Sequence, residues 1–485
     1  MQLSASECEV FSKLLKELAR THKVWLDDPE AYYQKVKMGN AVLTWIDAPN
    51  DLKEEMREKW ESKEPCIYQL HHSSCSLSLI RELATLIHKR NLNCLSYELN
   101  PIIEEIVYEY ANSDLDGFAQ CMIHDGEQFD VKFQTLKNII SRRVWAFKKE
   151  FMRSVYQFPV TMFNLSNELQ ISKNIRLVPA YEIALTEKEL THFKDTRTFN
   201  YNYNYNYNYN YNYNYNYNYN YNYYLEVSVP TQCSKKLSRQ LAERARDATY
   251  NALKLLATRL SPQAIPLLAS NDRNNHLFDF YRVGKDRNNM GKTTTRNFHS
   301  FQSDSEQFWL AFHESRACET NYIDTVFQIP ELLLTPNFSS QRVVERLERA
   351  LLWYGDATRE PNFYQQIQKL VSSMEALVNF HEDKLTEVFK RRVTHLNITH
   401  NGLSDLIEDK AEKLYKARSK IVHGSSVDER LDFCAIDFCS ETLVRAIYYF
   451  SLFGFEKTGF NKKLPKFLDE LPTREELQRD RSLIA

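Results

Sequence analysis

The sequence has 485 residues, of which 43% are hydrophobic and 13% aromatic, so it can form about two to four domains with sizeable cores. The 62 Lys and Arg residues nearly balance the 64 Asp and Glu residues, which excludes a chain-wide basic field for nucleic-acid binding. Only 10 glycines occur, which disfavours the glycine-dependent dinucleotide and P-loop folds. Because the positive and negative charges nearly balance, any contact with nucleic acid must come from a local basic patch.

Cysteine usage and hydropathy indicate the cellular compartment. The nine cysteines are scattered and no C-x-x-C pair occurs, which is typical of a reduced protein without a structural zinc site. HHSSC (71–75) has no second pair of metal ligands, so we expect no metal and no cofactor. The first twenty residues lack a signal-peptide pattern, and no uncharged apolar run approaches the length of a membrane span. The sequence therefore predicts a cytoplasmic protein without a membrane partner.

Residues 1–155 are predicted to be a helical N-terminal region. SECEVFSKLLKELARTH shows helical spacing after a Ser6 cap, and SLSLIRELATLIHKR and FQTLKNIISRRVWAFKKEFMRSVYQF repeat the pattern. The stretch 141–153 interleaves Arg and Lys with Trp145, Phe147 and Phe151. Such a stretch could bind RNA phosphates and bases. It equally fits a helix whose aromatic residues point inward and whose charges face water.

Residues 156–300 are predicted to form an α+β region. VTMFNL, IRLVPAYEIAL, YLEVSV and LFDFYRV have strand character, KKLSRQLAERARDATYNALKLLATRL is an amphipathic helix, and KDRNNMGKTTTRN is a polar loop. From 200 to 223 the sequence is Asn-Tyr repeated twelve times, which we interpret as an insertion between TRTF and YLEVSV. Disorder and a pair of strands are both compatible with this low-complexity tract. A tyrosine platform for single-stranded bases is the functional alternative.

Residues 301–485 are again predicted to be helical, which makes the fold class mainly α. The expected helices are 305–318, 341–357, 363–380, 383–393, 404–423 and 428–453. Ser340 is the expected cap of the second helix and Ser404 that of the fifth. Gly402 and Gly424 flank the fifth helix.

The fifth helix carries a charge on its apolar stripe. Arg418 falls in the middle of the stripe formed by Ile407, Ala411, Leu414, Ile421 and Val422. A guanidinium keeps its proton, so burial requires a carboxylate, a helix end, a partner chain or a phosphate. A buried ion pair with Glu375 or Glu408 is the structural alternative, and His423 beside Gly424 then serves as a C-terminal cation.

The surroundings of Arg418 resemble the Apea-like HEPN domain family. The R-x4-H signature of that family is matched by Arg418 and His423, with Ser419 at its usual polar position. The pattern RLxxALxWYxxA is matched from Arg346 to Ala357. The similarity covers about residues 305–460, and it implies that 301–485 is a HEPN-type helical bundle preceded by an α+β N-terminal region that the Asn-Tyr repeat interrupts.

The resemblance implies a metal-independent endoribonuclease that acts as a homodimer, in a toxin or phage-defence role. Arg418 and His423 would be catalytic, Ser419 and Glu375 would support them, and Lys416 and Lys420 would guide the RNA backbone. Attack by a ribose 2′-hydroxyl would leave a 2′,3′-cyclic phosphate. The N-terminal regions, or an inhibitory or sensing partner, would restrain such an enzyme.

The alternative from a different class is a HEPN-type module that binds nucleotide, RNA or a protein partner without cleavage. On a straight helix, residues five apart point about 140° away from each other. Arg418 and His423 can therefore converge only if the helix breaks at His423-Gly424 or if a second chain completes the site.

Overall fold

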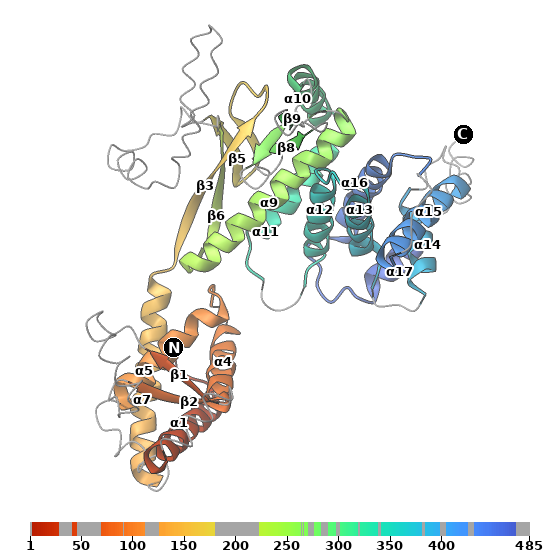
Figure 1. Ribbon diagram of the computed structural model, residues 1–485. Coiled ribbons are helices and arrows are strands. Elements are labelled where there is room, and N and C mark those ends of the chain that lie inside the picture. The colour runs from red at the N-terminus through yellow and green to blue at the C-terminus, as the bar shows by residue number, and fades with distance from the viewer. Residues whose placement is uncertain are drawn as a thin grey trace, which may run out of the picture. The chain divides into compact units, whose positions relative to one another are not determined.

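The computed structural model is mostly helical with a small antiparallel sheet (Figure 1). It describes residues 2–28, 41–45, 69–90, 92–111, 126–179, 223–262, 264, 266–269, 276–282, 290–296, 301–318, 321–337, 341–380, 384–397, 404–424 and 431–471. The chain divides into two compact units. Unit 1 comprises 1–153 and 231–239, and unit 2 comprises 154–230 and 240–485. No described helix is long and apolar enough to cross a membrane.

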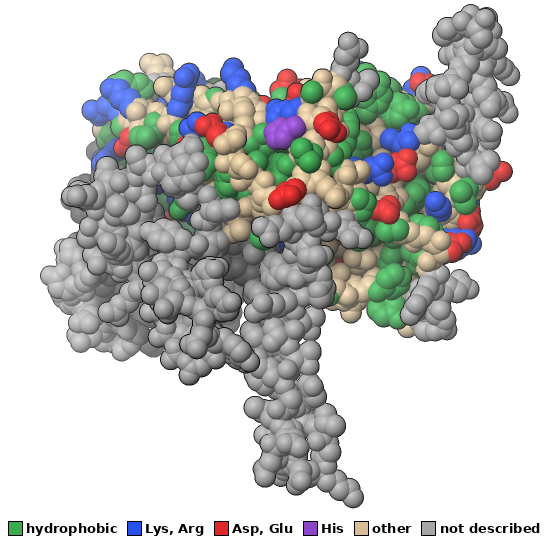
Figure 2. Space-filling view, turned by 90° about the horizontal axis from the view of Figure 1, so that it is seen from above, with side chains coloured by type: hydrophobic (Ala, Val, Ile, Leu, Met, Phe, Trp, Pro, Cys, Tyr) green, Lys and Arg blue, Asp and Glu red, His purple; other side chains and the backbone are tan. Residues whose placement is uncertain are grey.

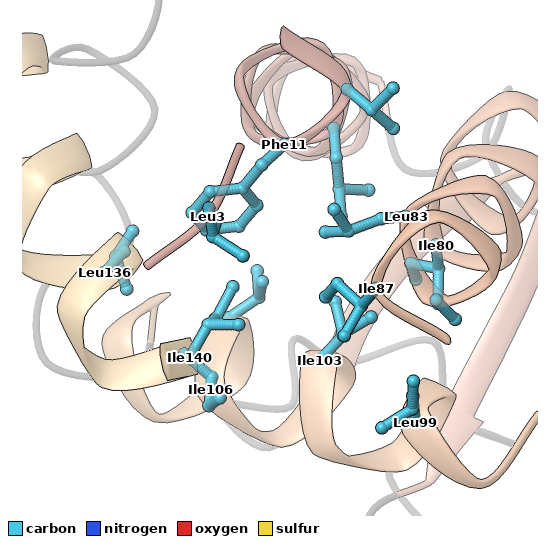
Figure 3. Packing of buried hydrophobic residues seen from close by; sticks show 14 of the residues in the cluster. Leu3, Phe11, Ile80, Leu83, Ile87, Leu99, Ile103, Ile106, Leu136 and Ile140 are labelled. Carbon is cyan, nitrogen blue, oxygen red and sulfur yellow. The ribbon is translucent and has the colours of Figure 1, made fainter. Parts of the chain in front are cut away.

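Unit 1 is a small helical unit with one antiparallel pair of strands. Its elements are α1 (Ala5–Asp27), β1 (Ala41–Trp45), β2 (Gln69–Ser73), α4 (Ser74–His88), η1 (Ser96–Glu98), α5 (Leu99–Ala111) and α7 (Gly126–Lys149). β1 and β2 pair antiparallel. Figure 3 shows Phe11 of α1, Leu83 of α4, Ile103 of α5 and Ile140 of α7 converging on one core. Three- and four-residue apolar spacing on each helix produces this core.

Two boundaries in unit 1 differ from the prediction. Ser6 lies inside α1, and the capping role belongs to Ser4: its hydroxyl accepts from the Glu7 N–H at 3.3 Å while Glu7 Oε2 accepts from the Ser4 N–H at 2.6 Å. This reciprocal pair is a capping box. The third predicted helix is too long, because α7 ends at Lys149 and β3 begins at Met152. SVYQF contains the strand-forming residues Val155, Tyr156 and Phe158, and it forms part of β3 in the sheet.

Unit 2 begins with a five-stranded sheet in the order β4-β5-β6-β3-β7. The strands are β3 (Met152–Met162), β4 (Leu169–Ser172), β5 (Ile175–Pro179), β6 (Tyr223–Cys233) and β7 (Leu267–Ala269). A separate antiparallel pair is formed by β8 (His276–Arg282) and β9 (Met290–Arg296). The predicted polar loop is therefore a strand from Met290 onward, while 283–289 lie outside the described residues.

The Asn-Tyr tract ends inside the sheet. Most of the tract, 200–222, lies outside the described residues, but its last residue, Tyr223, is the first residue of β6. Tyr223 is buried, pairs with Pro179 of β5, and donates its hydroxyl to the Leu165 carbonyl at 2.7 Å. The tyrosines of the tract occupy odd positions, as do the inward-facing Leu225 and Val227 of β6. The final Tyr is thus a structural residue and not part of a dispensable insertion.

α9 (Lys235–Leu260) packs between the sheet and the C-terminal helices of unit 2 (Figure 1). Arg246 lies over the Phe158 ring of β3 at 4.8 Å, whereas Arg244 forms an ion pair with Glu348 of α12. A Cβ added to Gly355 of α12 would lie 2.0 Å from Asn251 Oδ1 of α9. The two helices therefore approach closely because a glycine stands at the contact.

The C-terminal helices of unit 2 are α10 (Phe301–Ala317), α11 (Tyr322–Leu333), α12 (Val344–Ala357), α13 (Phe363–Val378), α14 (Leu385–Asn397), α15 (Ser404–Val422), α16 (Ala435–Phe453) and α17 (Lys463–Asp469). The six predicted helices are confirmed within a few residues at most ends, while α11 and α17 were not predicted. α16 starts at Ala435, later than expected. Ser340 and Gly402 lie outside the described residues, and α12 begins with no side-chain cap.

Candidate functional site

α15 positions most of the predicted site residues. Ala411, Leu414 and Tyr415 are buried against α13 and α14, and the Tyr415 ring lies 4.8 Å from that of Phe389. The opposite side carries paired charges: Lys413 contacts Asp409 at 2.7 Å and Asp432 at 2.9 Å. A surface helix with an apolar stripe and a charged opposite face turns about its axis so that the stripe faces the core.

Arg418 lies near the C-terminal end of the buried face, one turn after Leu414. Its side chain is 32% exposed, and its Nη2 atom is 3.7 Å from Glu375 Oε2 of α13. Ile421 is only half-buried and Val422 is 49% exposed, so the apolar stripe does not continue as a dry face to the end of the helix. The stripe that carries Arg418 is therefore only partly buried at this end of α15. Because water also solvates the guanidinium, the Arg418 side chain does not need a closer carboxylate than Glu375 at 3.7 Å.

Glu375, Tyr415 and Arg418 form one cluster. Burial raises the pKa of the Tyr415 hydroxyl, the negative charge of Glu375 raises it further, and the positive charge of Arg418 opposes the rise. Glu375 is the predicted ion-pair partner that the structure places beside Arg418, whereas Glu408 pairs with Lys390 at 3.3 Å. The sequence reasoning missed Tyr415, although its place three residues before Arg418 puts both on neighbouring parts of the helix surface.

His423 lies at the end of the helix and is exposed. Its backbone N–H donates to the Ser419 carbonyl at 3.1 Å, so helical hydrogen bonding continues through His423. Gly424 then turns the chain with φ +71°, which confirms the predicted glycine end of this helix. The break therefore follows the histidine. Within the described residues no hydrogen bond or ion pair joins His423 to Arg418.

The remaining predicted residues lie along the same two turns. Lys416 and Lys420 are exposed and, by helical spacing, share the face of His423. Lys416 forms an ion pair with Glu412, which also binds Lys390. These two lysines lower the pKa of Glu412 to about 2. Ser419 is half-buried, and its carbonyl is occupied by His423. α15 thus presents His423 and the two lysines on one face. Arg418 lies on another face, beside Glu375 of α13.

Residues of the RLxxALxWYxxA pattern have visible packing roles. Arg346 is buried, donates to the Asn379 carbonyl at 2.6 Å and lies over the Phe380 ring at 3.8 Å, where it closes the end of α13. Tyr354 is fully buried and donates to Thr258 Oγ1 of α9 at 2.8 Å; burial raises the pKa of its hydroxyl. Arg346 and Tyr354 therefore serve helix packing.

The face of the molecule seen in Figure 2 carries side chains of both charges. Figure 2 shows acidic, basic and hydrophobic side chains interspersed on the face seen there. In the described part of the chain, no group of three or more His, Cys, Asp or Glu side chains is placed to hold a metal ion. Comparisons with protein-family models, with curated proteins and with solved structures find no match to this chain.

Proposed function

We propose that the chain is a metal-independent endoribonuclease of the HEPN type, with Arg418 and His423 as its catalytic residues. The observation that carries the proposal is the end of α15, where a one-third-exposed guanidinium and an exposed imidazole are both open to a substrate. In this proposal the C-terminal helices form the HEPN-type bundle. The protein acts in the cytoplasm as a toxin or phage-defence effector.

The proposed chemistry needs only these two side chains and the RNA. His423 accepts the proton of a ribose 2′-hydroxyl, or gives one to the departing 5′-oxygen. The 2′-oxygen forms a bond to phosphorus while the bond from phosphorus to the 5′-oxygen breaks. Arg418 binds the phosphate oxygens and stabilises their charge as the new bond forms. The products are a 2′,3′-cyclic phosphate and a free 5′-hydroxyl.

A second protomer would bring an arginine and a histidine into one site. Because α15 remains helical through His423, Arg418 and His423 of one chain face different directions. In a two-fold dimer, the histidine of one protomer can approach the arginine of the other. Val422 is an apolar residue with 49% exposure between the two groups in sequence, and a dimer contact would cover it. We therefore propose a homodimer whose α15 helices meet near their C-terminal ends.

The supporting residues have separate tasks in this proposal. Glu375 holds the guanidinium loosely at 3.7 Å, so a phosphate can replace it without leaving a buried charge. Lys420 has no ion pair among the described residues and is the readier of the two lysines to contact the RNA backbone. Lys416 must first leave Glu412. Unit 1, or an inhibitory or sensing partner, restrains the nuclease.

A second candidate is a HEPN-type module that binds nucleotide, RNA or protein without cleavage. The observation in its favour is that Arg418 already has Glu375 as a partner, while no hydrogen bond or ion pair among the described residues joins His423 to either of them. In that case Arg418 is a structural or ligand-binding cation. Removal of the His423 imidazole would then leave every activity of the protein unchanged.

The experiment uses a matched pair of RNA substrates. Mixed-sequence RNA is incubated with the full-length protein, and the cleavage products are tested for a 2′,3′-cyclic phosphate end. A second substrate with 2′-O-methyl groups lacks the nucleophile and should remain intact. His313→Gln, at another exposed histidine, should cleave like the wild type, whereas His423→Gln should not. Cleavage of the 2′-O-methyl substrate would contradict the proposed chemistry.

A further inference from the structure

The C-terminal half of α7 in unit 1 exposes a tryptophan. Leu136, Ile140 and Val144 are buried in the core of unit 1, which Figure 3 shows for the first two. Phe147 packs partly against the same core. These contacts fix the rotation of the helix, so Trp145, one position after Val144, faces water with 51% of its surface exposed. The sequence-based alternative in which every aromatic residue of this stretch points inward is wrong at Trp145.

Arg142, Lys148 and Lys149 lie three or four residues from Trp145 and so, by helical spacing, on the same side of α7. Lys149 Nζ lies 3.4 Å from the centroid of the Trp145 ring, one helical turn away. Arg142 and Lys148 are exposed. None of these three cations is paired with a carboxylate among the described residues, in contrast to the partly exposed Lys413 of α15, which has two aspartates. A phosphate can therefore bind here without first breaking an ion pair.

We infer that Arg142, Trp145, Lys148 and Lys149, together called the α7 surface, bind single-stranded nucleic acid. The Trp145 ring stacks on an unpaired base, since every base has a π-face of suitable size. The cations neutralise the neighbouring phosphates and release their counterions. Arg142 and Lys149 are seven residues apart, about 10 Å along the helix, so the surface contacts only a few nucleotides. This inference does not rest on Arg418, on His423 or on cleavage.

A basic helix with a tryptophan also suggests an anionic membrane surface, but the distribution of apolar residues favours nucleic acid. A helix that lies in a membrane interface presents a row of large apolar residues along one face. The described side chains of α7 include one other exposed large hydrophobic residue, Val131. It precedes Trp145 by 14 positions, about 21 Å along the helix axis. One ring among cations suits a stacked base better than an acyl layer.

The test measures the binding of fluorescein-labelled oligonucleotides to the full-length protein by fluorescence anisotropy. Short single strands of thymidine and of 2′-O-methyluridine both lack the nucleophile, so binding is measured whether or not the protein cleaves RNA. A labelled duplex and vesicles containing phosphatidylserine are tested beside them. The variants are Trp145→Ala, Trp145→Phe and Lys149→Gln. The matched controls are Trp353→Ala, a tryptophan with 41% exposure in unit 2, and Lys413→Gln.

We expect the single strands to bind more tightly than the duplex. Trp145→Ala should weaken single-strand binding about fivefold to 150-fold, and Trp145→Phe should retain most of the affinity. With about three phosphates neutralised, the logarithm of affinity should fall with the logarithm of salt concentration with a slope of about −2, and Lys149→Gln should reduce that slope by about 0.7. The controls should bind like the wild type. Unchanged affinity in Trp145→Ala, equal losses in the controls, or binding to vesicles alone would overturn the inference.

Discussion

Replacing Arg418 with alanine distinguishes a functional arginine from a structural one. The Arg418 pair with Glu375 is 3.7 Å long, and its side chains are 32% and 20% exposed. Pairs of this kind contribute about 0.2–1 kcal/mol to folding, so Arg418→Ala should lower the free energy of unfolding by about 1 kcal/mol or less. If Arg418 holds a phosphate in the transition state, the same change should reduce cleavage by about 100-fold to 1000-fold.

Arg392 supplies an internal comparison. It is buried, donates to the Val378 carbonyl at 2.6 Å and binds both carboxylate oxygens of Asp469 at 2.9 and 3.1 Å. Arg392→Ala removes a buried guanidinium with its hydrogen bonds to Val378 and Asp469, although Arg391 remains 2.9 Å from the same carboxylate, and it should cost about 1.5–3 kcal/mol. Urea unfolding followed by circular dichroism measures both variants against the wild type. A loss in Arg418→Ala as large as that in Arg392→Ala would refute the reasoning and make Arg418 a structural residue.

Three further predictions concern the frame that carries the site. Gly355→Ala should cost about 1–3 kcal/mol, and the added change Asn251→Ala should restore most of it in thermal unfolding, because a Cβ at 355 would lie 2.0 Å from Asn251 Oδ1. Burial raises the pKa of the Asp469 carboxyl, but hydrogen bonds from Arg392 and Arg391 lower it by more, so that its pKa lies below the ordinary value. The stabilisation is therefore present above the unfolded-state pKa of about 4 and lost as pH falls through the folded pKa; Asp469→Asn should cost about 2–3 kcal/mol at pH 7 in urea unfolding and little in strong acid. Deletion of 200–222 should leave the melting temperature unchanged, whereas Tyr223→Ala, which removes a buried ring and its 2.7 Å hydrogen bond, should cost about 3–5 kcal/mol.

The spacing of apolar residues predicted most of the helices because this pattern lies within each helix and does not depend on its neighbours. The six expected C-terminal helices, the strands β5, β6 and β8 and the end of β3 all carry their pattern within a few turns or residues of chain. α11 was missed although Asn321 caps it, since Pro330 near its end is a helix-breaking signal in sequence. α17 is too short for periodicity to identify.

Burial at the candidate site could not be predicted from one helix. A helical wheel places Arg418 among apolar residues, but the neighbouring helices decide how much of that stripe is covered, and they leave Val422 exposed. Glu375 and Glu408 were both predicted as possible partners, and the selection of Glu375 depends on how α13 and α14 pack against α15. The same limit applies to Trp145, since only the packed core shows which face of α7 remains open.

The most direct test of the account is RNA cleavage by the purified full-length protein in EDTA, beside Arg418→Ala and His423→Ala, with the oligomeric state of all three measured by light scattering. The account predicts that the wild type is a dimer that cleaves RNA in EDTA, and that both variants remain folded dimers without cleavage. Absence of cleavage by the wild type, or cleavage that persists in either variant, would contradict it.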